Sequence, residues 1–508
     1  MNLNDKNIVS LFLSAAKEHP ENTAIIEGET SISYAELRLE VLQTAAYFKI
    51  KGIQQGDRVL VFVPMGINLY RIVLALFYIG ATAVFLDEWV SKKRMEICCE
   101  IADCKGFIGV TKARIFSFFS KELRKIPVKL SLKKRLNETV NIAEINKESS
   151  ALITFTTGST GLPKAADRSH LFLHEQFKAL INEIDPKSTD IDMPVLPIVL
   201  FVNLGVGCCS VIADFKMTKP ELMDSEKIAT QIKSNEVTRI TASPYFVKML
   251  ANHVLQSKTQ LPKVEKIFTG GAPVFPDEAD LYNKAFPDSK TTIVYGSTEA
   301  EPISSIDSKE LAKNNQLSVG LPVGTPYHKT DLVIIKISEE AMPNLSEDEF
   351  KKMQVKDGEI GEILVSGPHV LKKYFNNDEA FKQNKIIVNQ TIWHRTGDSG
   401  TILSKELFLT GRCQQLIKIN DTYFSPFIAE SKLQNTDGID CGTILSSDGN
   451  LILIVQSSLS KTELEERIQD LDYSKILILD KIPKDPRHNS KIDYESLRKL
   501  THIIHTRV

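Results

Sequence analysis

The sequence predicts an α/β protein with a large N-terminal domain of two doubly wound sheets plus a β-rich subdomain, and a small mobile α+β C-terminal domain. Strand-like apolar runs alternate with helix-like segments over residues 59–294, which is typical of doubly wound sheets. From about residue 328, short β-type runs follow one another without long helices between them. After Gly411 the chain restarts as an α+β unit of about a hundred residues, a normal domain size.

The first clear unit is a βαβ element. We expect a strand at Val59–Val63, a helix at Asn68–Ile79 and a strand at Thr82–Leu86. This is also the longest apolar region of the chain. Because Pro64 and Gly80 interrupt it, it predicts a buried sheet rather than a transmembrane segment.

The same alternation continues through the large domain. Further strands are expected at residues 107–111, 151–156, 193–200, 208–213, 238–242, 265–269 and 291–294. Helices between them are expected at residues 171–183, 225–234 and 244–256. Ligands of doubly wound sheets gather beyond the carboxyl ends of the strands, so the loops after these strands are the places to search for a site.

The pattern of the β-rich subdomain and of the chain's end sets the expected domain boundaries. Strands joined by turns are expected at Leu332–Ile337, Ile360–Ser366 and Thr401–Leu403. Residues 338–356 alternate in charge and are interpreted as a solvated insert. We expect a large domain over residues 1–411 and a small domain over residues 412–508.

Composition and charge indicate a globular, cytoplasmic protein. Of 508 residues, 62 are basic and 64 acidic, and this balance gives no electrostatic reason to expect nucleic acid or an anionic membrane as partner. The seven cysteines include no C-x-x-C pair, so reduced thiols are expected. The apolar run Ile8–Ala16 has helical periodicity and predicts an amphipathic helix rather than a secretory signal.

A loop rich in glycine and hydroxyl groups follows the strand at residues 151–156. Gly158 and Gly161 allow backbone N–H groups to turn toward oxygen anions. Hydroxyl donors and a positive charge come from Thr156, Thr157, Ser159, Thr160 and Lys164. The spacing differs from that of a Walker loop. The loop therefore predicts a polyphosphate site, and a flexible surface loop is the alternative interpretation.

Residues 153–166 resemble the phosphate loop of the adenylate-forming enzymes, a superfamily that includes acyl-CoA synthetases, firefly luciferases and the adenylation domains of peptide synthetases. The resemblance implies that the loop holds the β- and γ-phosphates of ATP. Further motifs match in the order of the family, and together with the loop they span residues 154–491. We therefore expect the fold and the first reaction of this superfamily.

Two of these motifs follow strand-like runs. Gly270-Gly271-Ala272-Pro273 resembles the family segment that borders adenine, although a tight turn is the alternative interpretation. Tyr295-Gly296-Ser297-Thr298-Glu299 resembles the family motif Tyr-Gly-x-Thr-Glu. In the roles that this motif implies, Tyr295 faces the base, Thr298 offers a hydroxyl to the α-phosphate and Glu299 holds Mg²⁺.

The remaining motifs contribute single charged groups. Asp398 follows a turn and is expected to accept hydrogen bonds from the two ribose hydroxyls, with an ordinary Gly-Asp turn as the alternative interpretation. Arg412 matches a family arginine that contacts ribose or phosphate. Lys491 matches the lysine that enters the site during adenylation, where its ammonium bridges the substrate carboxylate and the α-phosphate. Taken alone, Lys491 would be interpreted as a solvated lysine in a basic tail.

The C-terminal segment departs from the usual family pattern. Ser490 stands where most members have a glycine, and the run Arg487-His-Asn-Ser-Lys491 resembles that of the β-lactone synthetases of bacterial olefin biosynthesis. Gln414 stands where many acyl-CoA synthetases have Asp or Lys. Asp421 stands where thioester-forming members have a glycine that helps to form the pantetheine tunnel. Asp421 weakens the expectation of a thioester product and leaves that of adenylation unchanged.

The resemblance implies an AMP-forming ligase that activates a carboxylic acid, fatty or hydroxy-fatty, with ATP and Mg²⁺ and releases pyrophosphate. Two second steps stay open. One is transfer to CoA or to the phosphopantetheine of an acyl carrier protein, and the other is attack by a 3-hydroxyl, which gives a β-lactone without CoA. A non-catalytic nucleotide or acyl sensor is the hypothesis from another class.

A pocket for the acyl tail is expected at Val199–Gly207, beside Gly270 and Tyr295. The apolar residues of this segment are Phe201, Val202, Leu204 and Val206, with the small Gly205 and Gly207 nearby. The same residues also fit a helix that packs in the core, and the sequence does not decide between the two interpretations.

Overall fold

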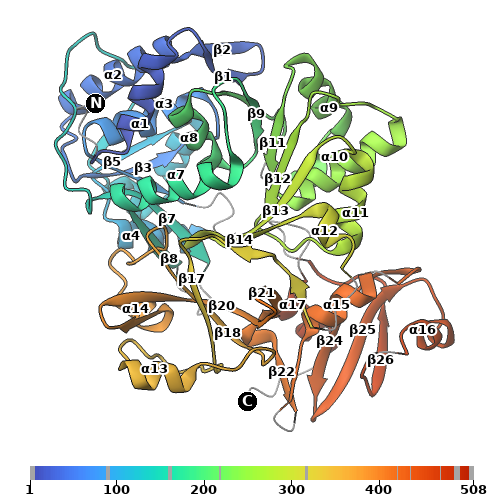
Figure 1. Cartoon of the computed structure of the whole chain (residues 1–508). Helices are drawn as coiled ribbons and strands as arrows, with labels where there is room; N and C mark the ends of the chain where they lie inside the picture. The colour runs from blue at the N-terminus through green and yellow to red at the C-terminus, as the bar shows by residue number, and fades with distance from the viewer. Residues whose placement is uncertain are drawn as a thin grey trace.

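The computed structural model describes residues 6–86, 92–157, 163–216, 219–314, 319–419, 422–434, 436–469, 471–484 and 492–502. Figure 1 shows their arrangement, with the helix-rich N-terminal half above and the C-terminal unit at the lower right. No helix within these ranges is long and apolar enough to cross a membrane. The fold is the α/β architecture that the sequence predicts.

The first sheet runs in the order β6-β5-β3-β4-β7-β8. Its strands are β3 (Arg58–Phe62), β4 (Thr82–Phe85), β5 (Gly106–Gly109), β6 (Val128–Leu130), β7 (Ser150–Thr157) and β8 (Pro163–Ser169). Strands β3 and β4 pair in parallel and are joined by α3 (Ile67–Tyr78), which confirms the expected βαβ element. Only β8 pairs with its neighbour in the antiparallel sense, so β7 and β8 form a hairpin at the sheet edge.

The second sheet runs in the order β16-β14-β13-β12-β11-β9-β10-β1-β2. Its central strands, which are parallel, are β1 (Thr23–Glu27), β9 (Ile191–Pro194), β10 (Cys209–Ile212), β11 (Arg239–Ala242), β12 (Lys266–Gly270) and β13 (Lys290–Ser297). The outer strands, which pair in the antiparallel sense, are β2 (Thr30–Ser33) at one end and β14 (Ala300–Asp307) and β16 (Thr325–Pro326) at the other. The change of direction after β13 places a tight turn, residues 298–299, at the carboxyl end of a parallel strand.

One expected strand is partly wrong. The apolar run 193–200 was predicted as a strand, but β9 ends at Pro194 and α8 (Pro197–Val206) begins three residues later. Pro197 occupies the first helical turn, and Gly207, at φ 95°, ends the helix in the left-handed region. A short apolar run does not reveal its period, and these two residues were the signal for a helix.

Helices cover the two sheets. In the first half of the chain these are α1 (Val9–Glu18), α2 (Tyr34–Ile50), α4 (Lys92–Ala102), α5 (Thr111–Ser117), α6 (Lys121–Lys125) and α7 (His170–Ile184). Beside the second sheet lie α9 (Ser225–Ser234), α10 (Pro244–Ser257), α11 (Pro276–Ala285) and α12 (Ser308–Leu311). Helix α1 confirms the expected amphipathic helix near the N-terminus, and its apolar face joins the largest hydrophobic cluster, which also includes α2, α3 and the first sheet.

The β-rich subdomain is a third sheet in the order β15-β21-β20-β18-β17, with β19 paired to β20. The strands are β15 (Leu321–Pro322), β17 (Asp331–Ile335), β18 (Gly361–Ser366), β19 (Lys385–Val388), β20 (Thr391–Leu403) and β21 (Glu406–Arg412). Two short helices, α13 (Glu347–Met353) and α14 (Asp378–Asn384), flank it. Helix α13 lies in the segment interpreted as a solvated insert, and Ser346 and Glu349 form its capping box.

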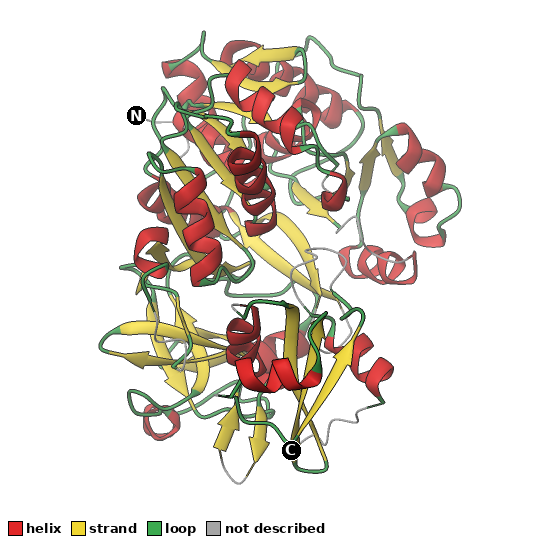
Figure 2. Ribbon diagram, turned by 90° about the vertical axis from the view of Figure 1, so that its right-hand side faces the viewer, coloured by secondary structure: helices red, strands yellow, loops and turns green. Residues whose placement is uncertain are grey.

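The C-terminal unit has the predicted α+β character. It consists of β22 (Ile417–Ile419), β23 (Thr422–Phe424), α15 (Pro426–Gln434), β24 (Ile439–Ser447), β25 (Asn450–Ser457), α16 (Lys461–Arg467), β26 (Lys475–Leu479) and α17 (Tyr494–Thr501). The side chains of one hydrophobic cluster all come from residues 417–476, so the unit has a core of its own. Figure 2 shows its strands and those of the third sheet below the helix-rich half.

Candidate functional site

The antiparallel pairing of β20 with β21 builds one side of the candidate site. Asp398 and Arg412 are opposite each other in this pair, and the Arg412 Nε lies 3.1 Å from the Asp398 Oδ1. The other carboxylate oxygen of Asp398 accepts a hydrogen bond of 2.8 Å from the Tyr295 hydroxyl, at the end of β13. The second and third sheets therefore meet at the Asp398 carboxylate.

The pKa values of two members of this group, Arg412 and Tyr295, are raised. The carboxylate of Asp398 is the largest influence that raises the pKa of Arg412, and the charge of Glu299 adds to it. Burial, followed by the charge of Asp398, raises the pKa of Tyr295, so that its hydroxyl stays protonated and donates. Arg412 keeps 54% of its side chain exposed and is accessible to a ligand.

A second group of charges lies around Glu299, in the turn between β13 and β14. Its Oε1 lies 3.4 Å from the Tyr374 hydroxyl. Burial lowers the pKa of Lys164, and the negative charge of Glu299 opposes that shift while Arg412 adds to it. The Lys164 Nζ donates a hydrogen bond of 2.6 Å to the Asn384 Oδ1. Lys164, Glu299 and Arg412, which are far apart in the sequence, thus lie within electrostatic reach of one another.

One short segment, residues 370–375, connects the two groups of strands that carry these charges. The Leu371 N–H donates to the Glu299 carbonyl over 2.7 Å, and the Phe375 N–H donates to the Ala165 carbonyl over 2.8 Å. Isolated bridges also pair the segment with β8 and with the start of β14. The segment therefore sets the spacing between Lys164 on β8 and the Glu299 turn.

Two buried cations beside this segment were missed by the sequence analysis. Arg168 on β8 donates from Nη2 to the Thr298 carbonyl over 3.2 Å, which fixes the backbone of the turn. Lys385 is fully buried, donates to the Leu371 carbonyl, and has its pKa lowered to about 7 by burial. Arg168 carried no clear signal in the sequence, because β8 also contains the charged residues Lys164 and Asp167.

Glycines let the strands of the site approach closely. A Cβ on Gly270 would lie 2.5 Å from the Val294 carbonyl oxygen, and one on Gly296 would lie 2.9 Å from the Ala300 carbonyl oxygen. Gly271 has φ 85°, with open space where a side chain would be, and it begins the turn that continues through Ala272 and Pro273. The predicted Gly-Gly-Ala-Pro segment is therefore a turn beside β13, with bare backbone at its start.

Polar atoms without a partner occur near the same strand ends. Among the described residues, the buried hydroxyls of Thr269 and Ser297 have no hydrogen-bond partner. Thr269 is the second-last residue of β12, and Ser297 is the last residue of β13, next to the turn that carries Thr298 and Glu299. Unpaired buried hydroxyls are costly, and a ligand at this edge is one means of satisfying them.

Several predicted residues lie outside the described ranges. They are Gly158, Ser159, Thr160 and Gly161 of the loop, and Asp421, Arg487, Ser490 and Lys491 of the C-terminal unit. The side chains of Thr156 and Thr157 are not described either, although the backbone of both completes β7. The residues that the structure brings together are Lys164, Tyr295, Glu299, Asp398 and Arg412.

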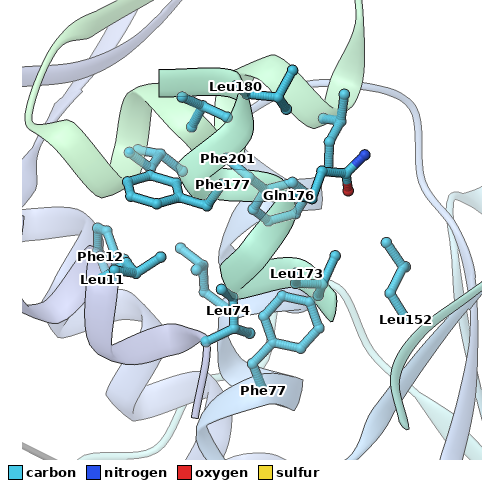
Figure 3. Close-up of a pocket in the computed structure, with 14 residues that line it drawn as sticks. Leu11, Phe12, Leu74, Phe77, Leu152, Leu173, Gln176, Phe177, Leu180 and Phe201 are labelled. Carbon is cyan, nitrogen blue, oxygen red and sulfur yellow. The ribbon is translucent and has the colours of Figure 1, made fainter. Parts of the chain in front are cut away.

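An apolar pocket lies between α1, α3, α7 and α8 (Figure 3). Its lining residues are Ile8, Leu11, Phe12, Leu74, Phe77, Leu152, Leu173, Gln176, Phe177, Leu180, Ile198, Phe201, Val202 and Leu204. Phe201, Val202 and Leu204 belong to the segment where a tail pocket was expected, whereas Gly270 and Tyr295 do not line it. Helix α8 therefore both packs in the core and lines a pocket.

One polar side chain interrupts this apolar lining. Gln176 on α7 is 1% exposed, and neither its Nε2 nor its Oε1 has a hydrogen-bond partner among the described residues. Figure 3 shows Gln176 among the apolar side chains that line the pocket. A buried amide without partners weakens the fold, so its position in a pocket indicates a place where polar atoms or water enter.

Comparisons with known proteins agree on one family of enzymes. The sequence model of the family described as AMP-binding enzyme matches residues 12–375. An olefin beta-lactone synthetase of Xanthomonas campestris pv. campestris is 26% identical, and the match covers 97% of this chain and 96% of that protein. A feruloyl-CoA synthase of Amycolatopsis is 25% identical over 85% of this chain and 83% of its own length.

Solved structures share the fold. An amide bond synthetase from Marinactinospora thermotolerans superimposes with a TM-score of 0.81 at 19% identity, covering 97% of this chain and 99% of that structure. The O-succinylbenzoate coenzyme A synthetase from Bacillus subtilis, solved with AMP, gives a TM-score of 0.78 at 19% identity, covering 97% and 98%. These likenesses bear out the predicted fold class.

Proposed function

Because the chain belongs to the AMP-binding enzyme family, we propose that it activates a long-chain 3-hydroxy acid with ATP and closes the acyl-adenylate to a β-lactone. As an adenylate-forming enzyme it acts on ATP and yields AMP. The identity of the acid and the fate of the adenylate are the parts that we infer. The observation that carries the proposal is the convergence of Lys164, Glu299, Asp398 and Arg412 at one edge of the sheets.

The nucleoside would be held by the group around Asp398. Its carboxylate is the acceptor for the ribose hydroxyls, and it is held in place by the Tyr295 hydroxyl and the Arg412 guanidinium. The ring of Tyr295 offers a face to adenine, as does the bare backbone at Gly271. We infer that the nucleoside is also bordered by Ala272, Pro273, Gly296 and Ser297. These residues lie in the adjoining turn and at the end of β13.

The phosphates would be held by Lys164 and by the loop 156–161, with the Thr298 hydroxyl at the α-phosphate. Glu299 fits Mg²⁺, because this ion takes one or two carboxylates and completes its ligands with substrate phosphates. The long contact of Glu299 with Tyr374, 3.4 Å, leaves the carboxylate available. When bound, Mg²⁺ would screen the negative charge of the triphosphate.

In the proposed first step, a carboxylate oxygen of the acid attacks the α-phosphorus, the bond to the β-phosphate oxygen breaks, and pyrophosphate leaves. Two anions must approach, so positioning and charge screening are the main contributions of the protein. Lys491 is proposed to bridge the carboxylate and the α-phosphate from the small domain. We place the boundary of that domain after residue 411, close to the start of its own core at Ile417.

The apolar pocket supports a long acyl chain. Leu152, which lines it, lies five residues before Thr157 on β7, a distance of about 16 Å along a strand. A tail in this pocket would thus extend far from the phosphate loop, which a short acid does not do. The olefin beta-lactone synthetase relatives, which match almost end to end, support an acid of the same class.

In the proposed second step, the 3-hydroxyl oxygen attacks the acyl carbon, the bond to AMP breaks, and the hydroxyl proton passes to solvent. The acid loses the elements of one water molecule overall. The run Arg487–Lys491 and Asp421 support this step over transfer to a thiol. Transfer to CoA remains the competing outcome, because relatives such as the feruloyl-CoA synthase are named for it.

The test is an exchange of pyrophosphate into ATP with a long-chain 3-hydroxy acid, followed by mass spectrometry of the product with and without CoA. We expect exchange, and release of AMP without CoA together with loss of water from the acid. Lys491→Ala should abolish exchange, whereas Lys499→Ala, an exposed partner of Glu495 on α17, should not. A thioester formed only with CoA would replace the lactone step, and full exchange in Lys491→Ala would refute the role of that lysine.

A further inference from the structure

The end of α5 and the turn that leads to α6 expose a concentrated set of large apolar side chains. Ile115 is 56% exposed, Phe116 41%, Phe118 71% and Phe119 69%. Single exposed apolar residues are normal on a protein surface, as at Leu39 and Leu222. Four within five consecutive residues are different, because a contiguous exposed apolar patch is typical of an interaction surface.

The turn is built so that its aromatic side chains point outward. The two positions that point inward, Ser117 and Ser120, are serines and are buried. Ser120 also caps α6, where its hydroxyl accepts from the Leu123 N–H, and the Phe118 N–H donates to the Ile115 carbonyl over 3.1 Å. The usual pattern of apolar side chains inside and polar ones outside is therefore reversed at this turn, which remains anchored to the body of the protein.

Positive charge surrounds the same turn. The segment 112–125 contains five basic side chains, Lys112, Arg114, Lys121, Arg124 and Lys125, and one acidic side chain, Glu122, a net charge of +4 in a chain whose total is −2. All five basic residues are exposed. The whole-chain balance, which gave no reason to expect an anionic partner, conceals this local segregation of charge.

We propose that this surface, residues 112–125, docks peripherally on an anionic lipid bilayer, with the aromatic side chains in the headgroup region and the basic side chains against the lipid phosphates. Basic residues beside exposed aromatic and aliphatic ones are the combination that holds a protein in the plane of a membrane surface. The apolar side chains are exposed on an outward turn, which suits a deformable lipid surface better than a partner that inserts a side chain. The inference does not depend on the acid that the enzyme uses.

The experiment is sedimentation of the purified full chain with vesicles of phosphatidylcholine alone, or of phosphatidylcholine mixed with phosphatidylglycerol. We expect binding to the mixed vesicles, and a fall in binding as salt is raised, because salt screens the basic side chains. The double variant Phe118→Ser/Phe119→Ser should bind about tenfold more weakly. Lys121→Glu/Arg124→Glu should also bind more weakly and lose most of the salt dependence.

The matched control is Leu39→Ser/Leu222→Ser, which removes two exposed apolar side chains elsewhere and should bind like the parent protein. Circular dichroism on each variant checks that the fold is kept. Absence of binding to the mixed vesicles would overturn the proposal. So would equal binding by the parent and the phenylalanine variant, and a surface whose substitution changes only association with another protein would belong to a protein interface instead.

Discussion

Replacement of Gln176 by leucine should stabilise the protein. The side chain is 1% exposed, and both polar atoms of its amide are without partners among the described residues. Each unpaired buried polar group costs about 1–3 kcal/mol, and leucine has a similar volume and no polar atom. Since water in the pocket would satisfy part of this deficit, we expect Gln176→Leu to raise the free energy of unfolding by about 2 kcal/mol.

The same substitution elsewhere should act in the opposite direction. Gln231 on α9 accepts from the Asp214 N–H over 3.0 Å and donates to the Ile212 carbonyl over 2.8 Å. Gln231→Leu removes both bonds, so we expect it to lower the free energy of unfolding by about 1–2 kcal/mol. The pair separates the effect of an unsatisfied amide from that of adding apolar surface.

Urea unfolding followed by circular dichroism measures both variants under the same conditions. The urea concentration at the midpoint of unfolding should be higher for Gln176→Leu and lower for Gln231→Leu than for the parent protein. The dependence of the unfolding free energy on urea concentration should be unchanged. A midpoint for Gln176→Leu at or below that of the parent would refute the reasoning. It would mean that the amide is satisfied inside the pocket and contributes to the fold.

Three further predictions concern the site. Leu173→Phe narrows the pocket, so KM should rise severalfold for long-chain acids and stay unchanged for short ones in a pyrophosphate-release assay. Asp398→Asn removes the charged partner of Arg412, so KM for ATP should rise tenfold or more in the same assay. A tenfold rise corresponds to a loss of about 1.4 kcal/mol of binding free energy. Burial lowers the pKa of Lys385 to about 7, below its unfolded value, so the unfolded chain binds more protons above pH 7 and stability should rise from about pH 7 to about pH 10. Lys385→Met should remove that rise, and an identical pH dependence of the melting temperature in both proteins would contradict the shift.

Local patterns predicted much of the fold. The βαβ element and the parallel strands β11, β12 and β13 are each contained in a short run of residues, so periodicity was sufficient to predict them. Helix α8 was mistaken in part for a strand, because its apolar run carries no clear period and only Pro197 and Gly207 mark its ends. The short helix α13 was missed among alternating charges.

The parts of the site that were not predicted depend on contacts between distant residues. Arg168 reaches a carbonyl 130 positions further along the chain, and the amide of Phe375 reaches Ala165. No local sequence pattern indicates such long-range contacts. The charged turn at residues 112–125 was missed for another reason, since a total charge of −2 averages over the whole chain and hides where the charges lie.

Residues 370–375 link strand β8 of the first sheet to the turn before β14 of the second sheet. The segment's hydrogen bonds to Ala165 and Glu299 fix how far apart those strands stand, and its length is set by the number of residues between Leu371 and Phe375. An insertion or deletion of one residue there would move either Leu371 or Phe375 away from its hydrogen-bond partner. Directed evolution of this protein should therefore tolerate side-chain changes in the segment far more readily than changes in its length.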